Sequence, residues 1–200
     1  MPADTQSEDP IELLRSDHKQ VLKLFETFKD EGDENKKMAI AEHICLALTV
    51  HTQIEEELFY PALRGKLDEV DIDEAYVEHA AAKDLIAQIE EAGEVSAMFE
   101  ARLQVLGEQV SHHIKEEEEK IFPAAKKAKI DTPELGQKMA QRKAALMRDH
   151  QSDVADAPVP TEAKRFDSGG ADMQPDTGSE TSSATSGGKK SAGEPRSGAR

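Results

Sequence analysis

The sequence predicts an all-α protein, an up-down-up-down four-helix bundle with an extra C-terminal helix and a disordered tail. Apolar residues recur at steps of three and four along four long stretches, which is the spacing of one helix face. A glycine follows each of the first three stretches, at Gly32, Gly65 and Gly93. Short connections of this kind make consecutive helices antiparallel neighbours, which gives the up-down-up-down order.

The first helix is expected to start at Pro10, because Asp9 is a good N-cap and proline suits the first helical position. It is expected to end before Gly32. Its apolar face consists of Ile11, Leu14, Val21, Phe25 and Phe28. His18 lies in the gap in the middle of this face, which therefore carries one polar residue.

The second helix is expected to run from about Asn35 to Arg64. Its apolar face consists of Ile44, Leu48, Leu58 and Ala62. His51 and Glu55 occupy the missing turns in the middle of the face. Two polar residues therefore interrupt this helix where apolar residues would be expected.

The third and fourth helices show the same interruption. The third is expected from about Val70 to Glu91, with Ile72, Tyr76, Ala82, Ile86 and Ile89 on its apolar face and His79 among them. The fourth is expected from about Val95 to Lys129. Its apolar face consists of Phe99, Leu103, Leu106, Val110, Ile121 and Ala124. His113 and Glu117 interrupt it.

A short sequence motif occurs twice, as HTQIEEELFYP from His51 to Pro61 and as HIKEEEEKIFP from His113 to Pro123. In both copies a glutamate stands four residues after the histidine, and a proline stands six residues after the glutamate. A four-residue step places two side chains on the same helix face, one turn apart. Imidazole and carboxylate at that spacing can bind one metal ion, and two such pairs suit a dinuclear site.

The polar interruptions of the four faces are expected to lie at one height. At about 1.5 Å per residue, each falls near mid-bundle when neighbouring helices are antiparallel. The six residues are His18, His51, Glu55, His79, His113 and Glu117. A single buried histidine is usually a core residue that bonds to a carbonyl. Four histidines and two carboxylates buried together without a metal would leave uncompensated charge, so the pattern favours a metal centre.

Other histidines and glutamates near the repeat are expected to lie outside the centre. His112 also has a glutamate four residues on, but only His113 is in register with Pro123, and His112 points about 100° away. The remaining histidines, off the apolar faces or at the end of the domain, are His43 and His150. The glutamates expected on solvated faces, with an outer role open for the first and third, are Glu56, Glu57, Glu118 and Glu119.

A lone histidine in the first and third helices and His-x-x-x-Glu in the second and fourth resemble the hemerythrin-like (HHE cation-binding) domain, over about residues 9–130. The resemblance implies a bundle that holds two non-haem iron ions. The terminal ligands it implies are His18, His51, His79 and His113. The glutamates it implies as carboxylate bridges are Glu55 and Glu117. Imidazole and carboxylate also suit zinc and manganese, so the metal stays open.

The third helix departs from the pattern of the oxygen-carrying hemerythrins, which have two histidines four residues apart there. The positions four residues from His79 are Ala75 and Lys83. With one imidazole fewer, the site has an additional open position or a substitute ligand. This favours a site that reacts with O₂, peroxide or nitric oxide, or one that senses iron and oxygen, over a simple reversible carrier.

Composition restricts the partners. The net charge of −16 argues against nucleic acid and against an anionic membrane surface. No stretch approaches the eighteen or more apolar residues of a membrane span, and the acidic N-terminus does not resemble a secretory signal. A single cysteine, Cys45, excludes an internal disulfide framework. We expect a cytoplasmic protein that binds a small molecule (O₂, peroxide or NO), with a redox or signalling partner that the sequence does not identify.

The chain is expected to divide into a flexible N-terminus at residues 1–8, a bundle domain at 9–150 and a disordered tail at 151–200. The tail contains no Leu, Ile, Tyr or Trp and is rich in Gly and Ser, so it has little apolar surface to bury. Within the domain, a weaker amphipathic stretch from about Pro133 to Asp149 is expected to form the extra helix.

Three functions are compatible with these patterns. The first is a di-iron protein that binds or reacts with O₂, peroxide or NO, with its status as an enzyme left open. The second is a non-enzymatic oxygen or iron carrier or sensor that uses the same site. The third is a metal-free helical interaction protein whose polar layer is structural.

Overall fold

The structure is a computed structural model, and it describes residues 9–156, with side chains up to residue 150. Residues 1–8, which were predicted to be flexible, lie outside the described residues. Most of the tail predicted to be disordered, from residue 157 to 200, also lies outside them. The boundaries predicted at residues 8/9 and 150/151 therefore stay predictions.

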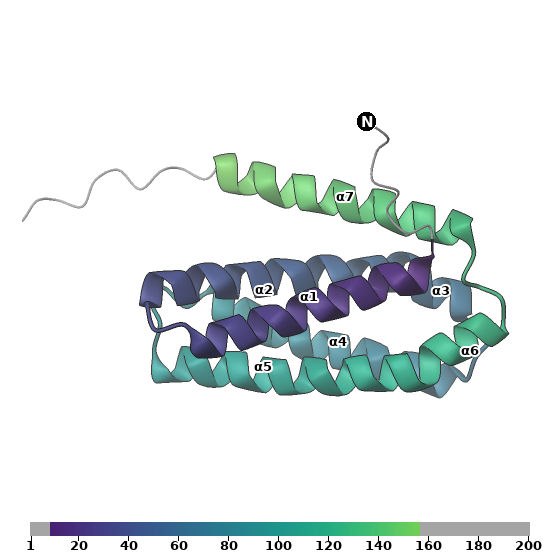
Figure 1. The fold of residues 1–200 in the computed structure, drawn as a ribbon, viewed down its shortest axis with the longest axis horizontal. Helices are drawn as coiled ribbons and strands as arrows, with labels where there is room; N and C mark the ends of the chain where they lie inside the picture. Colours follow the sequence, from purple (N-terminus) through teal and green to yellow (C-terminus); the bar gives the residue numbers. More distant parts are fainter. Residues whose placement is uncertain (1–8, 157–200) are drawn as a thin grey trace, which may run out of the picture. The chain divides into compact units, whose positions relative to one another are not determined.

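Four helices form an antiparallel bundle, as the sequence predicts: α1 (Pro10–Asp30), α2 (Glu34–Ile54), α4 (Glu69–Glu90) and α5 (Ala97–Glu116). Helix α1 packs against α2 and α5, and α4 packs against α2 and α5 (Figure 1). The extra helix, α7 (Pro133–Asp156), packs against α1 and α2. The all-α class and the five-helix arrangement are thus confirmed. No helix in residues 9–156 is both long and apolar enough to cross a membrane.

Each bundle helix begins after a side chain that accepts a hydrogen bond from the first helical turn. These N-caps are Asp9, Asp33, Asp68 and Ser96. Oδ1 of Asp9, for example, accepts from the backbone N–H of Ile11 at 2.8 Å. The caps fix where each helix starts, within two residues of the predicted positions, and so fix the heights of the side chains that follow.

Short segments continue α2 and α5 beyond the polar residues. Helix α2 continues as the π-helical turn η1 (Glu55–Phe59) and the short helix α3 (Tyr60–Leu63). Helix α5 continues as the π-helical turn η2 (Glu117–Ile121) and the short helix α6 (Phe122–Lys127). Both π turns begin at the glutamate of a repeat copy, and π turns of this kind are frequent at functional sites.

The π turns shift the helix face that follows them. A π turn holds more residues than an α turn, so the side chains beyond it rotate out of the α-helical pattern. Residues predicted for the core that are only half-buried are Leu58, Ala62 and Ala124. Residues buried in their place are Phe59, Leu63 and Ala125. This part of the prediction was wrong by one residue, because it assumed uninterrupted α-helix.

Two apolar clusters fill the bundle, one on each side of the polar layer. The first includes Ile11, Leu14, Ile54, Phe59, Tyr60, Leu63, Ile72 and Phe122. The second includes Val21, Phe25, Phe28, Ile44, Leu48, Ile86, Phe99, Leu103 and Leu106. Along α1, His18 lies between Leu14 of the first cluster and Val21 of the second. The polar layer is therefore enclosed by apolar side chains above and below.

The proline of the first repeat copy leaves one backbone carbonyl without its π-helical hydrogen-bond donor, and a tyrosine hydroxyl donates to that carbonyl instead. In η1 the N–H of Tyr60 donates to the carbonyl of Glu55, five residues back. The next such bond would run from Pro61 to Glu56, but proline has no N–H. The hydroxyl of Tyr76 in α4 donates to the Glu56 carbonyl instead, at 3.3 Å. This contact ties η1 to the neighbouring helix.

Loss of this hydroxyl is expected to destabilise the protein. Tyr76→Phe should lower the free energy of unfolding by about 1 kcal/mol, because the Glu56 carbonyl loses its partner. In a Pro61→Ala background an N–H becomes available to that carbonyl, so Tyr76→Phe should cost less. Urea unfolding of the four proteins in the cycle measures both effects. An equal cost in both backgrounds would contradict the assignment of the carbonyl to Tyr76.

Candidate metal centre

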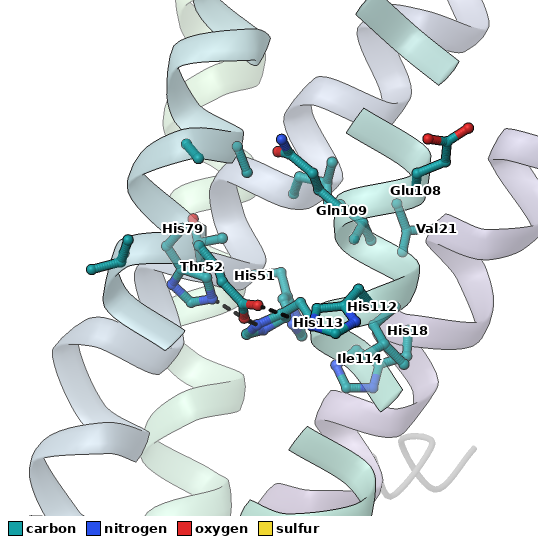
Figure 2. A pocket seen from close by; sticks show the side chains of 16 residues that line it. His18, Val21, His51, Thr52, His79, Glu108, Gln109, His112, His113 and Ile114 are labelled. Atoms are coloured by element: carbon teal, nitrogen blue, oxygen red, sulfur yellow. Dashed lines mark hydrogen bonds and ion pairs between the residues drawn. The ribbon is translucent and has the colours of Figure 1, made fainter. Parts of the chain in front are cut away.

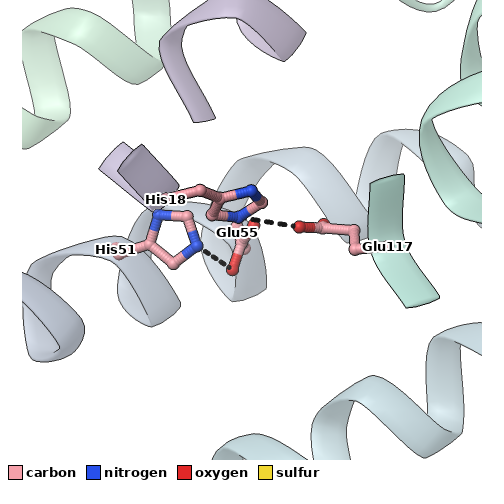
Figure 3. A group of neighbouring side chains, drawn as sticks. All are labelled: His18, His51, Glu55 and Glu117. Carbon is pink, nitrogen blue, oxygen red and sulfur yellow. Dashed lines mark ion pairs between the residues drawn. The ribbon is translucent and has the colours of Figure 1, made fainter. Parts of the chain in front are cut away.

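The six residues predicted as ligands meet in the middle of the bundle. They come from α1, α2, η1, α4, α5 and η2, and each is at most 8% exposed: His18, His51, Glu55, His79, His113 and Glu117. Their potential ligand atoms form two groups, and within each group the atoms lie within 4.8 Å of one another. The first group contains His18, His51, Glu55 and Glu117, drawn in Figure 3. The second contains Glu55, His79 and His113. Glu55 belongs to both groups.

The Nε2 atoms of the histidines face the carboxylates. Nε2 of His51 lies 3.2 Å from Oε2 of Glu55, and Nε2 of His18 lies 3.2 Å from Oε2 of Glu117 (Figure 3). On the other side, Nε2 of His79 lies 3.4 Å from Oε2 of Glu55 and 3.2 Å from Nε2 of His113. All four imidazoles therefore direct the same ring nitrogen towards the centre.

The Nδ1 atoms face outward, each towards a further carboxylate. Nδ1 lies 3.0 Å from Glu118 in His18, 3.0 Å from Glu56 in His79 and 2.8 Å from Glu78 in His113. Nδ1 of His51 lies 3.6 Å from Asp17, which also contacts Lys143 of α7. A carboxylate that accepts from Nδ1–H keeps Nε2 free and orients the ring, which is the usual support of a metal-binding histidine.

Two of these outer carboxylates were predicted and two were missed. Glu56 and Glu118 were the glutamates for which an outer role was open, and the structure places both against a histidine of another helix. Asp17 and Glu78 were not identified. A signal was present, since each precedes a predicted ligand, in Asp17-His18 and Glu78-His79. Adjacent residues point about 100° apart on a helix, so such a neighbour faces the next helix.

The two halves of the bundle are similar at the centre. The ring of Phe122 stacks on His18 at 5.8 Å, and the ring of Tyr60 lies 5.5 Å from His79. These aromatic residues precede the prolines of the two repeat copies. They differ in one respect: the hydroxyl of Tyr60 donates to Oε1 of Glu117 at 3.3 Å.

Several inward-facing atoms are buried without a hydrogen-bond partner. They include Nε2 of His18, Nε2 of His51, both carboxylate oxygens of Glu55 and Oε2 of Glu117. Some of these atoms lie within 3.2 Å of one another, yet their geometry does not make a hydrogen bond. A cation among them would satisfy them together, so the residues present fit a metal ion.

Burial and neighbouring charges shift the pKa values of the glutamates and histidines in the centre. Burial raises the pKa of Glu55 well above its usual value, and the nearby charge of Glu117 adds to this effect. Burial acts in the same direction on Glu117, but His18 and the other histidines outweigh it and lower the pKa of Glu117. Burial lowers the pKa of His51 to about 4, so its imidazole is neutral near pH 7 and available as a ligand.

Neither of the positions four residues from His79 supplies a further ligand. Nζ of Lys83 lies 2.7 Å from both carboxylate oxygens of Glu56 and is directed to this outer residue. Ala75 is buried in the first apolar cluster. His112 also stays outside the centre, with its side chain 63% exposed and near Glu116.

Residues 9–125 of the chain match the hemerythrin HHE cation binding domain family. A protein described as a DNA nickase, from Nostoc sp., is 31% identical over 122 residues, which cover 61% of this chain. The match covers 35% of that protein, so this chain spans about a third of its length. Among solved structures, a hemerythrin HHE cation binding domain-containing protein from Mycobacterium kansasii matches with a TM-score of 0.65 and 22% identity. That match covers 74% of this chain and 93% of the other, and at this identity it shows the fold alone.

Fold and site together define a helical bundle with buried histidine and glutamate clusters consistent with a metal site. The chain belongs to the hemerythrin HHE cation-binding domain family, since the match covers more than half of its length. The family resemblance noted in the sequence is thereby confirmed.

Replacing Glu55 by glutamine is expected to stabilise the metal-free protein. A carboxyl whose pKa is higher in the folded state costs stability once the pH exceeds its unfolded value. At pH 7, Glu55→Gln should therefore raise the free energy of unfolding of the metal-free protein, by on the order of 1 kcal/mol. Added metal should raise the melting temperature of the wild type more than that of the variant. Glu119→Gln, at an exposed position, serves as the control, and equal effects of the two variants would contradict the prediction.

The adjacent histidines are expected to differ in metal binding. His113→Ala should lower the metal content of the purified protein, because His113 is buried among the clustered ligand atoms. His112→Ala should leave it unchanged, because this side chain is exposed. Elemental analysis of the two variants measures the difference, and equal metal content in both would refute the register assigned to the end of α5.

Proposed function

We propose that this domain holds two non-haem iron ions and binds or reacts with O₂, peroxide or nitric oxide beside them. The observation that carries the proposal is the sharing of Glu55 between two groups of buried ligand atoms. Both of its oxygens are without a hydrogen-bond partner. A carboxylate in that position suits a bridge between two cations.

The residues divide between two metal positions. One position would be held by His18 and His51, and the other by His79 and His113, with Glu55 and Glu117 as the bridging carboxylates. When bound, two ferrous ions supply two electrons to a molecule of O₂ or peroxide. Imidazole and carboxylate ligands also bind zinc or manganese. We propose iron, and the metal content of the purified protein is the first test of this proposal.

The protein side chains prepare the site in three ways. Outer carboxylates hydrogen-bond to Nδ1 of His18, His79 and His113 and hold these imidazoles with Nε2 turned inward. The hydroxyl of Tyr60 donates to Oε1 of Glu117 and orients that carboxylate. The two apolar clusters restrict water on both sides of the layer. The second metal position has one imidazole fewer than in oxygen-carrying hemerythrins, which supports reaction with a small molecule at an exchangeable position.

We propose further that the partner is a small molecule, with no nucleic acid or membrane involved, and that the protein is cytoplasmic. The net charge of −16 supports this, since phosphate backbones and anionic lipids repel an acidic surface. The Nostoc relative carries the description of a DNA nickase, but the matched region is 35% of that protein.

The proposal predicts about two irons per chain after expression with sufficient iron. His51→Ala and Glu117→Ala should each lose at least one iron while circular dichroism shows a helical protein, because each variant removes an inward-facing donor. Glu119→Ala is the matched control at an exposed glutamate of the same segment. A His51→Ala or Glu117→Ala protein that keeps two irons would refute the ligand assignment. A wild type without stoichiometric metal would favour the metal-free interaction protein.

The chemistry can be separated from simple oxygen carriage. With an exchangeable position at the second metal, azide should bind readily and change the visible spectrum. The reduced protein should be oxidised by air and should consume peroxide faster than free iron does. A long-lived oxygenated spectrum that reverses on removal of O₂, with no peroxide consumption above that of free iron, would instead assign the protein to the carriers.

A further inference from the structure

A cavity of about 410 Å³ reaches the candidate metal centre from the surface (Figure 2). It lies among α1, α2, α4 and α5, and the four inward histidines form its inner end: His18, His51, His79 and His113. Its walls are almost entirely apolar. The buried apolar residues among them are Val21, Leu48, Ala82, Val110 and Ile114, and the buried Thr52 adds one hydroxyl.

The mouth of the cavity is exposed and carries polar groups. Val77 of α4 is 70% exposed there, although it is a large apolar residue. Around it lie Glu78, Glu108, Gln109 and His112, which contribute two carboxylates. The polar part of the mouth therefore carries two carboxylates, and its residues come from α4 and α5.

The size of the cavity exceeds what a diatomic molecule requires. An apolar cavity of roughly 150 Å³ holds a molecule of the size of benzene, and this cavity is more than twice as large. Ligand sites of small organic molecules are typically apolar cavities of about 300 to 1,000 Å³ with a few polar groups.

We propose that this cavity binds a neutral, mainly apolar organic molecule next to the metal centre. The molecule would pack its apolar part against Leu48, Val110 and Ile114 and direct a polar group towards the histidine layer. This deepens the proposed function by naming the class of its organic substrate, and the reaction of that molecule rests on the proposed function. Its binding depends only on the cavity.

In the metal-free protein, charge at the mouth selects against anions. A carboxylate that enters would pass Glu78 and Glu108 and would lose its hydration in an apolar space, which is costly without a cation beside it. Among the described residues, no lysine or arginine lines the cavity, and Lys83, which follows the lining residue Ala82, is paired with Glu56. A neutral alcohol or hydroperoxide of the same size meets neither obstacle.

The test uses two probes of nearly equal size, cumyl alcohol and 4-isopropylbenzoate. Calorimetry and methyl NMR on the full-length protein, both metal-free and iron-loaded, measure their dissociation constants. Cumyl alcohol should bind and shift the methyl signals of Val21, Leu48 and Ile114. The metal-free protein should bind the carboxylate about tenfold more weakly or not at all.

Two variants place the binding in the cavity. Ala82→Leu fills the wall and should weaken cumyl alcohol binding about tenfold or more. Ala81→Leu narrows the exposed mouth without altering the core, and it decides the result if Ala82→Leu does not fold. Ala87→Leu, on an exposed position of the same helix outside the cavity, should leave the dissociation constant unchanged.

The outcomes separate this inference from the proposed function. If neither form binds cumyl alcohol, or if Ala81→Leu, Ala82→Leu and Ala87→Leu bind it alike, the cavity is not the site and the inference is wrong. Tighter binding of the carboxylate than of the alcohol by the metal-free protein would overturn the neutral class. A protein that binds the alcohol but takes up no stoichiometric metal would keep the cavity and remove the di-iron proposal. A protein with two irons and no affinity for the alcohol would keep the di-iron proposal and refute the inference about the cavity.

Discussion

Glu55 and Glu117 are fully buried at mid-bundle, where a carboxylate charge costs several kcal/mol unless positive charge lies beside it. The arrangement around them follows from this cost. Four histidines turn Nε2 towards the pair. Outer carboxylates hydrogen-bond to the other ring nitrogen of three of them, and Asp17 lies 3.6 Å from that of His51. Protein groups alone do not complete the layer, because oxygens of both glutamates keep no hydrogen-bond partner. The two apolar clusters thus stabilise the fold, and the polar atoms without hydrogen-bond partners are gathered in one layer, as a cation site requires.

The π turns give this plane its geometry. In each repeat copy the glutamate stands at the start of a π turn, so its side chain shares a face with the histidine one turn before it. The extra residue of the turn then rotates Phe59 and Phe122 into the first apolar cluster, below the polar layer. Proline six residues after the glutamate fits the end of such a turn, because the carbonyl it leaves free can be taken by another group, as Tyr76 does for Glu56.

The fold class and the layer could be predicted from the sequence because both follow from spacing along single helices. Steps of three and four gave the faces, and the His-x-x-x-Glu repeat gave the register of His113 over His112. What the sequence did not yield depends on contacts between helices. The shift from Leu58 to Phe59 arises from a π turn that α-helical periodicity cannot represent. Asp17 was missed for a similar reason, since it supports His51, a histidine of another helix, although its place before His18 was visible.

The two halves of the centre are similar in sequence but have different surroundings, and helix α7 contributes to the difference. Asp17, which faces His51, also contacts Lys143 of α7, so its charge is shared between two partners. Burial would raise the pKa of Asp17, but His51 and Lys143 together lower it. Glu78, the corresponding residue for His113, lies at the mouth of the cavity. The α1–α2 side therefore packs against α7 and its lysine, with a smaller pocket of about 160 Å³ that reaches His51, whereas the larger cavity opens between α4 and α5. A molecule from outside would reach the histidine layer by way of this acidic mouth, so the two halves of the layer differ in their surroundings.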